Sequence, residues 1–471
     1  MKNMTPRRMA EVAGGVLHIP EGMEETADKE VSNIVTDSRK AGEGSCFAAI
    51  PGSRVDGHTF IPQVFAQGAA CVLSERELAN APGCWIRVGS TLQALQALAE
   101  YYRKVMNIPV VGVTGSVGKT STKEMIASVL SRKYRVLKTE GNFNNELGLP
   151  LTIFNLREEH EIAVLEMGIS HFGEMHRLSK IARPDTAVIT VIGNCHLEFL
   201  GSRDGVLKAK TEIFDFLNPG GHIVLNGDDD KLAGIKSVGN ITPVRYGLRE
   251  NREAPGTDEP KLDYWAENTE EKGLDGVSCR IHMPDAAMDV LIPMPGRHNV
   301  MNALAAASVG EIYGLTPEEI REGIEQIEGI KGRFHIVRTG KYTVIDDCYN
   351  ANPASMEESL HILSRAEGRK VAVLGDMGEL GADEKKFHAQ IGTIAGQCGI
   401  DVLACAGKLC LEMAQAARQA AGENGRLKIY YYEDRGELMA ALPDLLREKD
   451  TILIKASHFM EYDRIVEALT T

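Results

Sequence analysis

The stretch from Val110 to Leu130, VVGVTGSVGKTSTKEMIASVL, constrains the fold of this chain more than any other segment. It begins with a β-branched run typical of a buried parallel strand, continues through a glycine-rich turn, and ends in apolar residues at helical spacing. A strand, a glycine loop and a helix N-terminus form an anion site, because backbone N–H groups and the helix dipole point at a bound phosphate. The segment therefore predicts an α/β domain with a mostly parallel sheet.

The residues inside the loop predict ATP as its ligand. Lys119 stands where it would contact the outer phosphates, and the hydroxyl of Thr120 stands where it would hold a magnesium ion. The strict phosphate-loop pattern has glycine where this chain has Val113, and a glycine turn without a ligand is the alternative. The predicted ATP-binding residues of the loop are Thr114, Gly115, Ser116, Val117, Gly118, Lys119, Thr120 and Ser121.

A second predicted strand, in the segment EIAVLEMGIS, ends at Glu166. A carboxylate at the end of a strand beside a phosphate loop is placed to hold magnesium, directly or through water. A solvated glutamate is the alternative. The rival nucleotide class, a GTPase switch, would carry Asn-Lys-x-Asp and Asp-x-x-Gly after Lys119, and neither appears. We therefore expect a protein that uses ATP and Mg2+.

Length, charge and cysteine usage narrow the class of protein. A chain of 471 residues is expected to form several domains. No apolar run approaches the roughly 20 residues of a membrane helix, and no apolar core of a signal peptide follows the first basic residues. The formal charge of −14 argues against non-specific binding to nucleic acid. Nine scattered cysteines indicate a reducing compartment, so we expect a cytoplasmic protein.

Several segments carry a family resemblance, and they occur in the order VTGSVGKTSTKEM, TEGNFNNELGLPLT, LEMGISHFGEM, NCHLEFLGS, LKAKTEIF, PGRHNVMNALAA, KGRF, DDCYNANPASM and LGDMGELG. Over nearly its whole length the chain resembles the Mur ligases, ATP-dependent amide-forming enzymes of peptidoglycan synthesis, and hence of cell wall biogenesis, cell shape and cell division. The resemblance implies small-molecule substrates, a UDP-N-acetylmuramoyl-tripeptide and D-alanyl-D-alanine, joined through an acyl phosphate. It leaves open whether the tripeptide carries lysine or diaminopimelate. We expect a monomer.

The resemblance also implies catalytic and metal-binding residues. The catalytic residues would be Lys119, Lys210, His196 and Glu166. The ligands of two magnesium ions would be Thr120, Glu166, His196 and Lys210. From the residues alone, His196 lies on a loop at the carboxyl end of a strand, where a lone histidine is more often structural. Lys210 lies in an amphipathic helix pattern, where a lysine is ordinarily a surface charge. In the family the aligned lysine is carbamylated by CO2, which needs an unprotonated amine and hence a lowered pKa.

Nucleotide and substrate contacts follow from the same resemblance. Further ATP contacts are implied at Asn299, Arg333 and Asp347. Substrate contacts are implied at Ser38, Arg39, Gly52, Asp56, His58, Asn142, Asn144, Asn145, Tyr349, Asn350 and Asn352. The residues alone are also compatible with a plain polar turn around the asparagines and with a strand–turn–helix connection capped at Ser355.

The chain is expected to form three α/β domains. Residues 1–88 would be a small UDP-substrate-binding domain, 89–328 a central P-loop ATPase-type domain with a mostly parallel sheet, and 329–471 a Rossmann-like domain. The charged, turn-rich segment 247–294 predicts an antiparallel flap. The last domain lacks Gly-x-Gly-x-x-Gly, so we expect no dinucleotide there. His458 stands where the family usually has arginine, which replaces a fixed charge with a titratable one.

Two alternatives remain open at the level of sequence. One is another Mur-type ligase, such as the enzyme that adds the third peptide residue, or a folylpolyglutamate synthase. The combination of LGDMGELG with DDCYNANPASM favours the enzyme that uses D-alanyl-D-alanine. The other is a nucleotide-dependent switch or scaffold that hydrolyses ATP slowly without ligation. Phosphate release that depends on substrates separates this class from the ligases.

Overall fold

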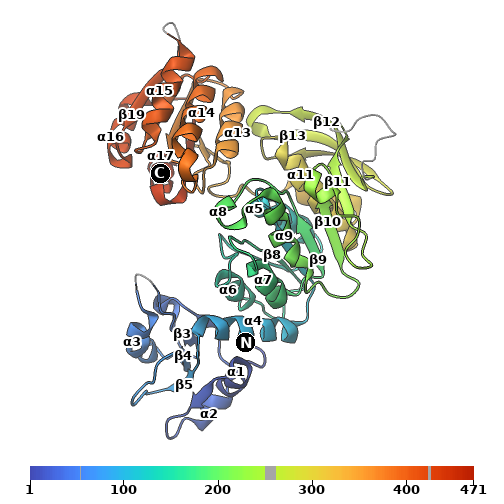
Figure 1. Ribbon diagram of the computed structural model, residues 1–471, viewed down its shortest axis with the longest axis vertical. Coiled ribbons are helices and arrows are strands. Elements are labelled where there is room, and N and C mark those ends of the chain that lie inside the picture. Colours follow the sequence, from blue (N-terminus) through green and yellow to red (C-terminus); the bar gives the residue numbers. More distant parts are fainter. Residues whose placement is uncertain (53–54, 250–260, 423–425, 471) are drawn as a thin grey trace. The chain divides into compact units, whose positions relative to one another are not determined.

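The computed structural model describes residues 1–52, 55–249, 261–422 and 426–470. Its three sheets and their helices confirm the predicted α/β class (Figure 1). The chain divides into two compact units. The first contains Met1–Trp265, Met283–Ala286 and Leu304–Gly323, and the second contains Ala266–His282, Ala287–Ala303 and Ile324–Thr471. The domain boundaries expected at 88 and 328 stay predictions.

The first unit begins with a five-stranded sheet in the order β1-β5-β4-β3-β2. β1 is antiparallel to β5, and the other neighbours are parallel. The strands are β1 (Val16–His18), β2 (Ile34–Val35), β3 (Cys46–Ala48), β4 (Cys71–Ser74) and β5 (Cys84–Arg87), with helices α1 (Pro6–Ala13), α2 (Glu24–Asp28) and α3 (Ile61–Ala66). Because successive residues of β3 enter opposite cores, both faces of this sheet are buried.

A parallel sheet in the order β11-β10-β9-β6-β8-β7 forms the centre of the first unit. Its strands are β6 (Val110–Thr114), β7 (Val136–Lys138), β8 (Ile162–Glu166), β9 (Thr186–Ile189), β10 (His222–Asn226) and β11 (Val244–Leu248). The helices that follow these strands are α5 (Lys119–Leu130), α6 (Gly148–Ile153), α7 (Glu174–Ala182), α8 (Leu197–Leu200), α9 (Arg203–Thr211) and α10 (Asp230–Ala233). The apolar face expected for the helix after the glycine loop is confirmed, because its aliphatic residues are buried.

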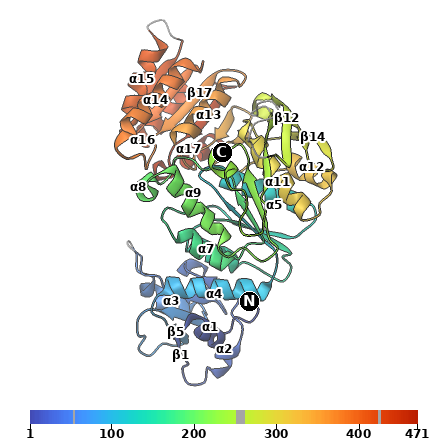
Figure 2. The ribbon, with the colours of Figure 1, turned by 45° about the vertical axis from the view of Figure 1, so that its right-hand side comes forward.

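Helix α4 (Thr91–Met106) packs against helices from both parts of the first unit. It begins at the N-cap Ser90 and ends at Asn107, which adopts the left-handed conformation. Figure 2 shows α4 in cyan between the N-terminal sheet and α7. Its buried residues contribute to one continuous core that includes residues of both sheets. The N-terminal sheet and the central sheet are therefore packed as one body.

The second unit contains an antiparallel hairpin and a six-stranded sheet. The chain enters this unit within β12 (Tyr264–Glu271), and β13 (Val277–His282) then pairs antiparallel with β14 (Ala287–Ile292), as expected for part of the flap. Residues 250–260 of that predicted flap lie outside the described part of the chain. Helices α11 (His298–Ile312) and α12 (Pro317–Glu325) follow, and their residues from Leu304 to Gly323 belong to the first unit.

The six-stranded sheet has the order β15-β16-β20-β17-β18-β19. Only its edge strand β15 runs antiparallel, and separate apolar cores cover its two faces. Its strands are β15 (His335–Arg338), β16 (Thr343–Asp346), β17 (Lys370–Gly375), β18 (Val402–Ala406), β19 (Lys428–Tyr432) and β20 (Thr451–Lys455). Its helices are α13 (Pro353–Ser364), α14 (Glu384–Gln397), α15 (Cys410–Ala421), α16 (Arg435–Leu445) and α17 (Asp463–Thr470).

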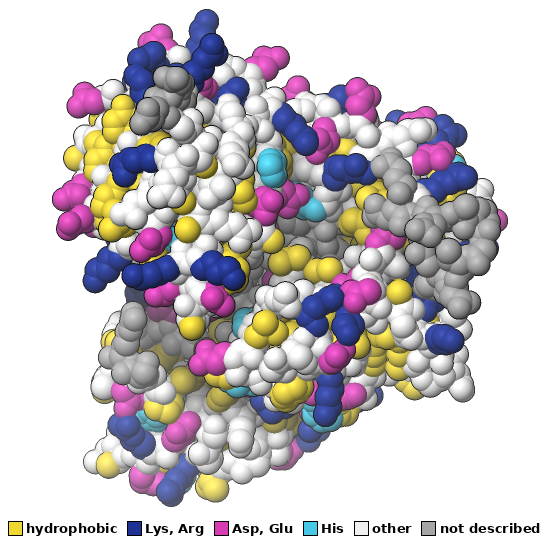
Figure 3. Space-filling model, turned by 45° about the horizontal axis from the view of Figure 1, so that its top comes forward, with side chains coloured by type: hydrophobic (Ala, Val, Ile, Leu, Met, Phe, Trp, Pro, Cys, Tyr) yellow, Lys and Arg dark blue, Asp and Glu magenta, His cyan; other side chains and the backbone are white. Residues whose placement is uncertain are grey.

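The surface mixes charges of both signs. On the face in Figure 3, lysine and arginine side chains are scattered among aspartate and glutamate. Within the described ranges, no helix combines the length and the apolar character that crossing a membrane would require.

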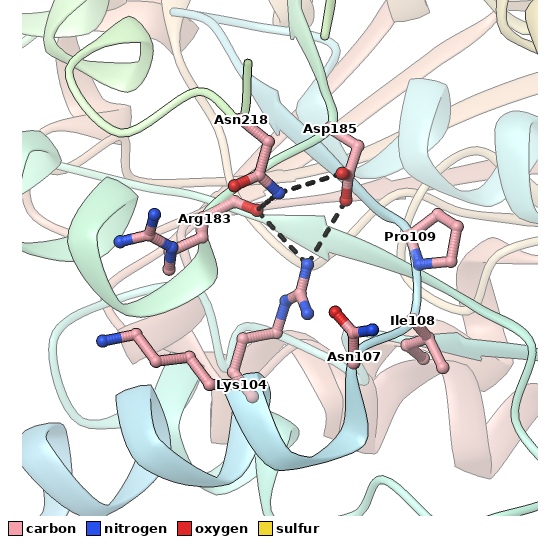
Figure 4. A pocket seen from close by; sticks show the side chains of 8 residues that line it. Lys104, Asn107, Ile108, Pro109, Arg183, Asp185 and Asn218 are labelled. Carbon is pink, nitrogen blue, oxygen red and sulfur yellow. Dashed lines mark hydrogen bonds and ion pairs between the residues drawn. The ribbon is translucent and has the colours of Figure 1, made fainter. Parts of the chain in front are cut away.

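A pocket of about 230 Å³ lies at the amino ends of β6 and β9, at the opposite end of these strands from the glycine loop. Its buried Arg103 donates from Nε to Ala182 O, at 2.9 Å, and from Nη2 to Arg183 O and to Asp185 Oδ2, each at 3.3 Å. Figure 4 shows Asn218 joining this network through Asp185 and the carbonyl of Arg183. Because Arg103 satisfies carbonyls at the C-terminal end of α7, the cluster is structural.

We expect Arg103→Ala to lower the free energy of unfolding of the first unit by about 3 kcal/mol, because it leaves buried carbonyls and Asp185 without their donor. Both tryptophans, Trp85 and Trp265, lie in that unit, so their fluorescence during urea unfolding reports its stability. Lys104→Ala is the matched control. Lys104 lines the same pocket but pairs with Glu100 on the surface of α4, so its loss should cost less than about 0.5 kcal/mol. Equal effects of the two changes would contradict the structural role of Arg103.

Candidate functional site

The glycine loop between β6 and α5 is fixed in shape by its neighbour β9. At Gly115, whose φ is +154°, an added Cβ would lie 1.9 Å from Thr190 Oγ1. The same hydroxyl donates to Val117 O at 2.6 Å, and Ser116 N donates to Val191 O at 2.8 Å. Only glycine fits this position, since any side chain would displace the hydroxyl that holds the loop.

The N-terminus of α5 opens into this loop. Helix α5 begins after Gly118, at φ +81°, and this N-cap glycine contributes no side-chain capping bond. Lys119 donates from Nζ to Gly115 O at 2.8 Å and to Ser116 O at 3.4 Å, so its ammonium group lies over the loop. Thr120 and Ser121 follow in the first helical turn and are half-buried. A helix N-terminus that begins at a glycine, beside a lysine, matches the chemistry of a phosphate site.

Glu166 and Thr114 place unsatisfied oxygens beside the loop. In the pairing of β6 with β8, Glu166 lies opposite Val113, at the carboxyl ends of both strands. Glu166 Oε1 accepts from Asn144 Nδ2 at 2.8 Å. Glu166 Oε2 and Thr114 Oγ1 are buried and have no hydrogen-bond partner among the residues that the structure describes. Buried oxygens without donors are what a hard cation such as Mg2+ requires, so these residues fit the expected metal.

His196 lies on the loop after β9, as its sequence position predicted. It is half-buried and adopts the left-handed conformation at φ +51°, which a residue with a Cβ seldom adopts. The loop is tied to the glycine loop through Ser116 Oγ, which accepts from Gly193 N at 2.9 Å and from Cys195 Sγ at 3.1 Å. The strained backbone of His196 is thus held next to the phosphate loop, as is common at functional sites.

Lys210 is buried, although a lysine in an amphipathic pattern reads as a surface charge. Burial in α9 lowers the pKa of its amine to about 7, and the nearby positive charge of Lys119 contributes to the shift. The end of α9 is anchored because the carboxylate of Glu212 accepts from Gly173 N, at 3.1 Å, and from His176 N, at 3.2 Å. An amine with this pKa is largely unprotonated just above neutral pH, which is the property that carbamylation needs.

The structure also contains a buried lysine that the sequence analysis did not single out. Lys123 of α5 is fully buried, and its Nζ donates to Thr139 O at 2.6 Å and pairs with Glu124 Oε1 at 2.8 Å. A signal was present in the sequence, because Lys123 precedes Ile126 by three residues and Leu130 by seven, which puts it on the apolar face of the helix.

The asparagine-rich stretch divides into structural and accessible members. Asn144 contacts Glu166, as described, and its carbonyl accepts from Gly168 N at 2.8 Å. Asn145 Oδ1 accepts from Leu147 N and Gly148 N, so this side chain stabilises the start of α6. Asn142 is exposed. The expected substrate role therefore fits Asn142 better than Asn144 and Asn145, whose side chains already bind Glu166 and the start of α6.

The predicted substrate residues of the N-terminal sheet lie in two short helical turns. Asp56 and His58 hold one turn together, because Asp56 Oδ1 contacts His58 Nδ1 at 2.8 Å while His58 Nε2 accepts from Glu75 N at 3.1 Å. Gly52 lies before this turn, and its N–H donates to Val55 O. In the other turn Ser38 is buried, whereas Arg39 is exposed and pairs with Asp37 at 2.7 Å, which lowers the pKa of that carboxyl to about 2. Arg39 is the member of the set best placed to meet a ligand.

In the second unit, Asp347 is a hub. Its carboxylate accepts from Lys455 Nζ at 2.6 Å, from Ser359 Oγ at 2.7 Å and from Phe334 N at 3.1 Å. These bonds join β20, α13 and the segment before β15 at the carboxyl end of β16. A ribose contact at Asp347 would have to share a carboxylate that already accepts these donors.

Other predicted residues of the second unit also have structural partners. Asn352 is the N-cap of α13, and Ser355 is its N3 partner in a capping box, so the helix is capped by Asn352 rather than at Ser355. Asn299 is buried, donates to Pro295 O at 2.8 Å and accepts from Asn302 Nδ2 at 2.9 Å. Asn350 contributes its carbonyl to Lys455, at 3.2 Å.

A cation–aromatic cluster lies beside this hub. The guanidinium of Arg333 lies 4.1 Å from the centre of the Tyr349 ring, and the ring of His458 lies 5.9 Å from the same centre. Arg333 and Tyr349 are half-buried, whereas His458, the residue that departs from the family pattern, is exposed. A cation–aromatic contact of this kind offers surface for a planar or anionic ligand.

Comparison with known proteins gives concordant matches. Three family models match: Mur ligase family, catalytic domain, over residues 30–115; Mur ligase middle domain over 113–310; and Mur ligase, glutamate ligase domain over 332–458. The UDP-N-acetylmuramoyl-tripeptide–D-alanyl-D-alanine ligase of Bacillus subtilis is 37% identical over 100% of this chain and 99% of its own. The Escherichia coli enzyme of that name is 35% identical over 94% of each chain.

Solved structures agree with these relatives. A crystal structure of MurF from Acinetobacter baumannii matches with a TM-score of 0.87 and 33% identity, over 99% of this chain and 98% of that one. MurF from Thermotoga maritima in complex with ADP matches with a TM-score of 0.77 and 29% identity, over 93% of this chain and 97% of that one.

We expect Gly115→Ala to weaken ADP binding by about 5- to 150-fold, because the new Cβ meets Thr190 Oγ1 and overpacking of this kind costs about 1–3 kcal/mol. Isothermal titration of the variant with ADP measures the change. Gly220→Ala is the control, since Gly220 also has a positive φ, +79°, but no atom of the described residues lies within 4 Å of its added Cβ. Equal ADP affinity in wild type and Gly115→Ala would contradict the assigned role of Gly115.

Proposed function

The chain belongs to the Mur ligase family, and we propose that it joins D-alanyl-D-alanine to a UDP-N-acetylmuramoyl-tripeptide with ATP as the energy source, in peptidoglycan precursor synthesis. The observation that carries this function is full-length similarity to enzymes of that printed name, at 37% identity over the whole chain for the Bacillus subtilis relative. The glycine loop with Lys119 supports the nucleotide. The expected acid–amino-acid ligase class thus follows from both lines of support.

The reaction divides into two steps. The terminal carboxylate of the tripeptide attacks the γ-phosphorus of ATP, the bond to the ADP oxygen breaks, and an acyl phosphate and ADP form. The amine of D-alanyl-D-alanine then attacks the acyl carbon, loses a proton, and expels phosphate as the amide forms. Lys119 and the N-terminus of α5 compensate the negative charge on the transferring group. Water has to be excluded from the acyl phosphate, which hydrolyses readily.

Magnesium is proposed as the metal, with two ions held by Thr120, Glu166, His196 and Lys210. The support is the chemistry of the donors, because the buried oxygens of Glu166 and Thr114 lack partners among the described residues. When bound, Mg2+ would compensate phosphate charge and polarise the phosphoryl oxygens.

Lys210 is proposed to act as a carbamate. Its neutral amine would form an N–C bond with CO2 and release a proton, which converts a buried cation into an anion that can bind metal. The support is its burial and a pKa of about 7. The free-amine fraction rises with pH through this value, so the modified fraction should rise between about pH 6 and 8.

The remaining predicted contacts are proposed on the basis of the family. Arg39 and its neighbours would contact the nucleotide sugar, and Tyr349 and Asn350 would line the cleft. The N-terminal sheet would bind the substrate far from the reacting carboxylate and use that binding energy for positioning. We further propose the cytoplasm as the site of action, supported by nine cysteines that are all free thiols. The monomeric state stays a prediction.

We expect steady phosphate release only when ATP, Mg2+, UDP-N-acetylmuramoyl-tripeptide and D-alanyl-D-alanine are present together. Each amine is tested in turn by a coupled phosphate assay, with the lysine-containing and the diaminopimelate-containing tripeptide. Lys119→Ala should retain less than about a tenth of kcat, a loss above about 1.4 kcal/mol of transition-state stabilisation. Faster turnover with free L-lysine, diaminopimelate or L-glutamate would assign another ligase, and release indifferent to every amine would favour a nucleotide switch.

We expect Lys210→Ala to lower kcat by about 100-fold, and added short carboxylates such as acetate to restore part of the activity by occupying the vacated position. Lys208→Ala is the matched control, because Lys208 lies two residues away on the exposed face of α9, over the ring of Phe172. An active Lys210→Ala variant would return Lys210 to a structural role. Inactivity without rescue would count against the carbamate.

A further inference from the structure

Lys123 joins three segments that meet beside the nucleotide loop. It lies on α5, the helix that the loop begins. Its Nζ donates to the carbonyl of Thr139, directly after β7, and lies 3.9 Å from Glu166 Oε2 at the end of β8. The Oγ1 of Thr139 accepts from Glu166 N at 3.0 Å. One ammonium group therefore fixes the ends of two strands relative to the helix that follows the phosphate loop.

The distances leave the free oxygen of Glu166 available. Asn144 occupies Oε1, and Lys123 is engaged at close range by Thr139 O and by Glu124 rather than by Oε2. At 3.9 Å the lysine compensates the buried carboxylate charge without forming a hydrogen bond to it. Oε2 thus keeps its lone pairs for another ligand while its position is set from both sides.

We propose that Lys123 is a positioning residue for the divalent cation, which presets the carboxylate of Glu166 by clamping the ends of β7 and β8 to α5. This inference rests on the proposed function in one respect, the assignment of Glu166 as a metal ligand. Lys123 itself touches neither the cation nor the substrate. It acts through Glu166 and Thr139.

A purely structural lysine would behave differently. If Lys123 served only to neutralise Glu124 inside the fold, its loss would lower stability and leave cation affinity unchanged in the folded protein. Glu124 already has a second cation, because its Oε2 pairs with Lys138 Nζ at 2.5 Å. Lys138 is therefore a matched control: it shares the partner Glu124, but its side chain is 47% exposed, and no ion pair links it to Glu166 among those identified in the described residues.

The test measures cation binding directly, with Mn2+ as the probe in place of Mg2+. Free Mn2+ is followed by electron paramagnetic resonance during titration of the full-length protein saturated with ADP. We expect Lys123→Met to weaken Mn2+ binding by about tenfold or more, in line with the loss of a group that supports a metal ligand. Lys138→Met should stay within about twofold of wild type. Mn2+ affinity unchanged in a folded Lys123→Met protein would overturn the proposal.

Two further variants keep the outcome interpretable. Lys123→Met combined with Glu124→Gln removes the buried charge pair together, so that a folded protein is available if the single change unfolds the chain. This double variant should also bind Mn2+ about tenfold more weakly, and wild-type affinity would overturn the proposal. Glu166→Gln should weaken Mn2+ binding at least as much. If it does not, Glu166 is no ligand and the positioning role is lost, while amine-dependent phosphate release in the wild type would still establish the ligase.

Discussion

The parallel pairing of β6 with β8 on one side and β9 on the other is the constraint on which the site depends. Parallel strands end at the same edge of a sheet, so the glycine loop, Glu166 and the His196 loop meet although they are far apart in sequence. The register sets Glu166 opposite Val113, one residue before Thr114. A slip of one residue along β8 would turn the carboxylate to the other face of the sheet. The relative positions of the glycine loop, Glu166 and His196 are thus set by one pattern of backbone hydrogen bonds.

Two buried lysines in the first unit have different surroundings, which suit them to different chemical roles. Lys123 has a carboxylate and a carbonyl within hydrogen-bonding distance, so its positive charge is compensated inside the fold. Lys210 is influenced instead by the positive charge of Lys119, and burial lowers its pKa to about 7. A compensated charge suits a clamp, whereas an amine that loses its proton near neutral pH suits a nucleophile. The two lysines lie on helices that follow neighbouring strands, β6 and β9.

Much of the fold and part of the site could be predicted from local sequence. The glycine loop could be predicted because its conformation needs specific residue types, and the apolar face of α5 could be predicted from the helical spacing of its apolar residues. The burial of Lys123 was not predicted, because a lysine in a helix is usually a surface charge. Only its helical spacing from Ile126 and Leu130 indicates that it lies on the apolar face. Asn145, Asn299 and Asn352 share their residue type with candidate ligands, yet their amides serve neighbouring backbone or side chains. Such partners depend on tertiary contacts that no spacing reveals.

The absence of a side chain at Gly115 has an evolutionary consequence. Every change of a glycine codon to another amino acid adds a Cβ, and at this position that atom would lie 1.9 Å from Thr190 Oγ1. No substitution at Gly115 is therefore compatible with the folded loop as long as Thr190 is retained. An inhibitor that draws its affinity from the backbone of this loop would contact atoms that single mutations at Gly115 cannot remodel without damaging the loop itself. Resistance would have to arise elsewhere in the chain.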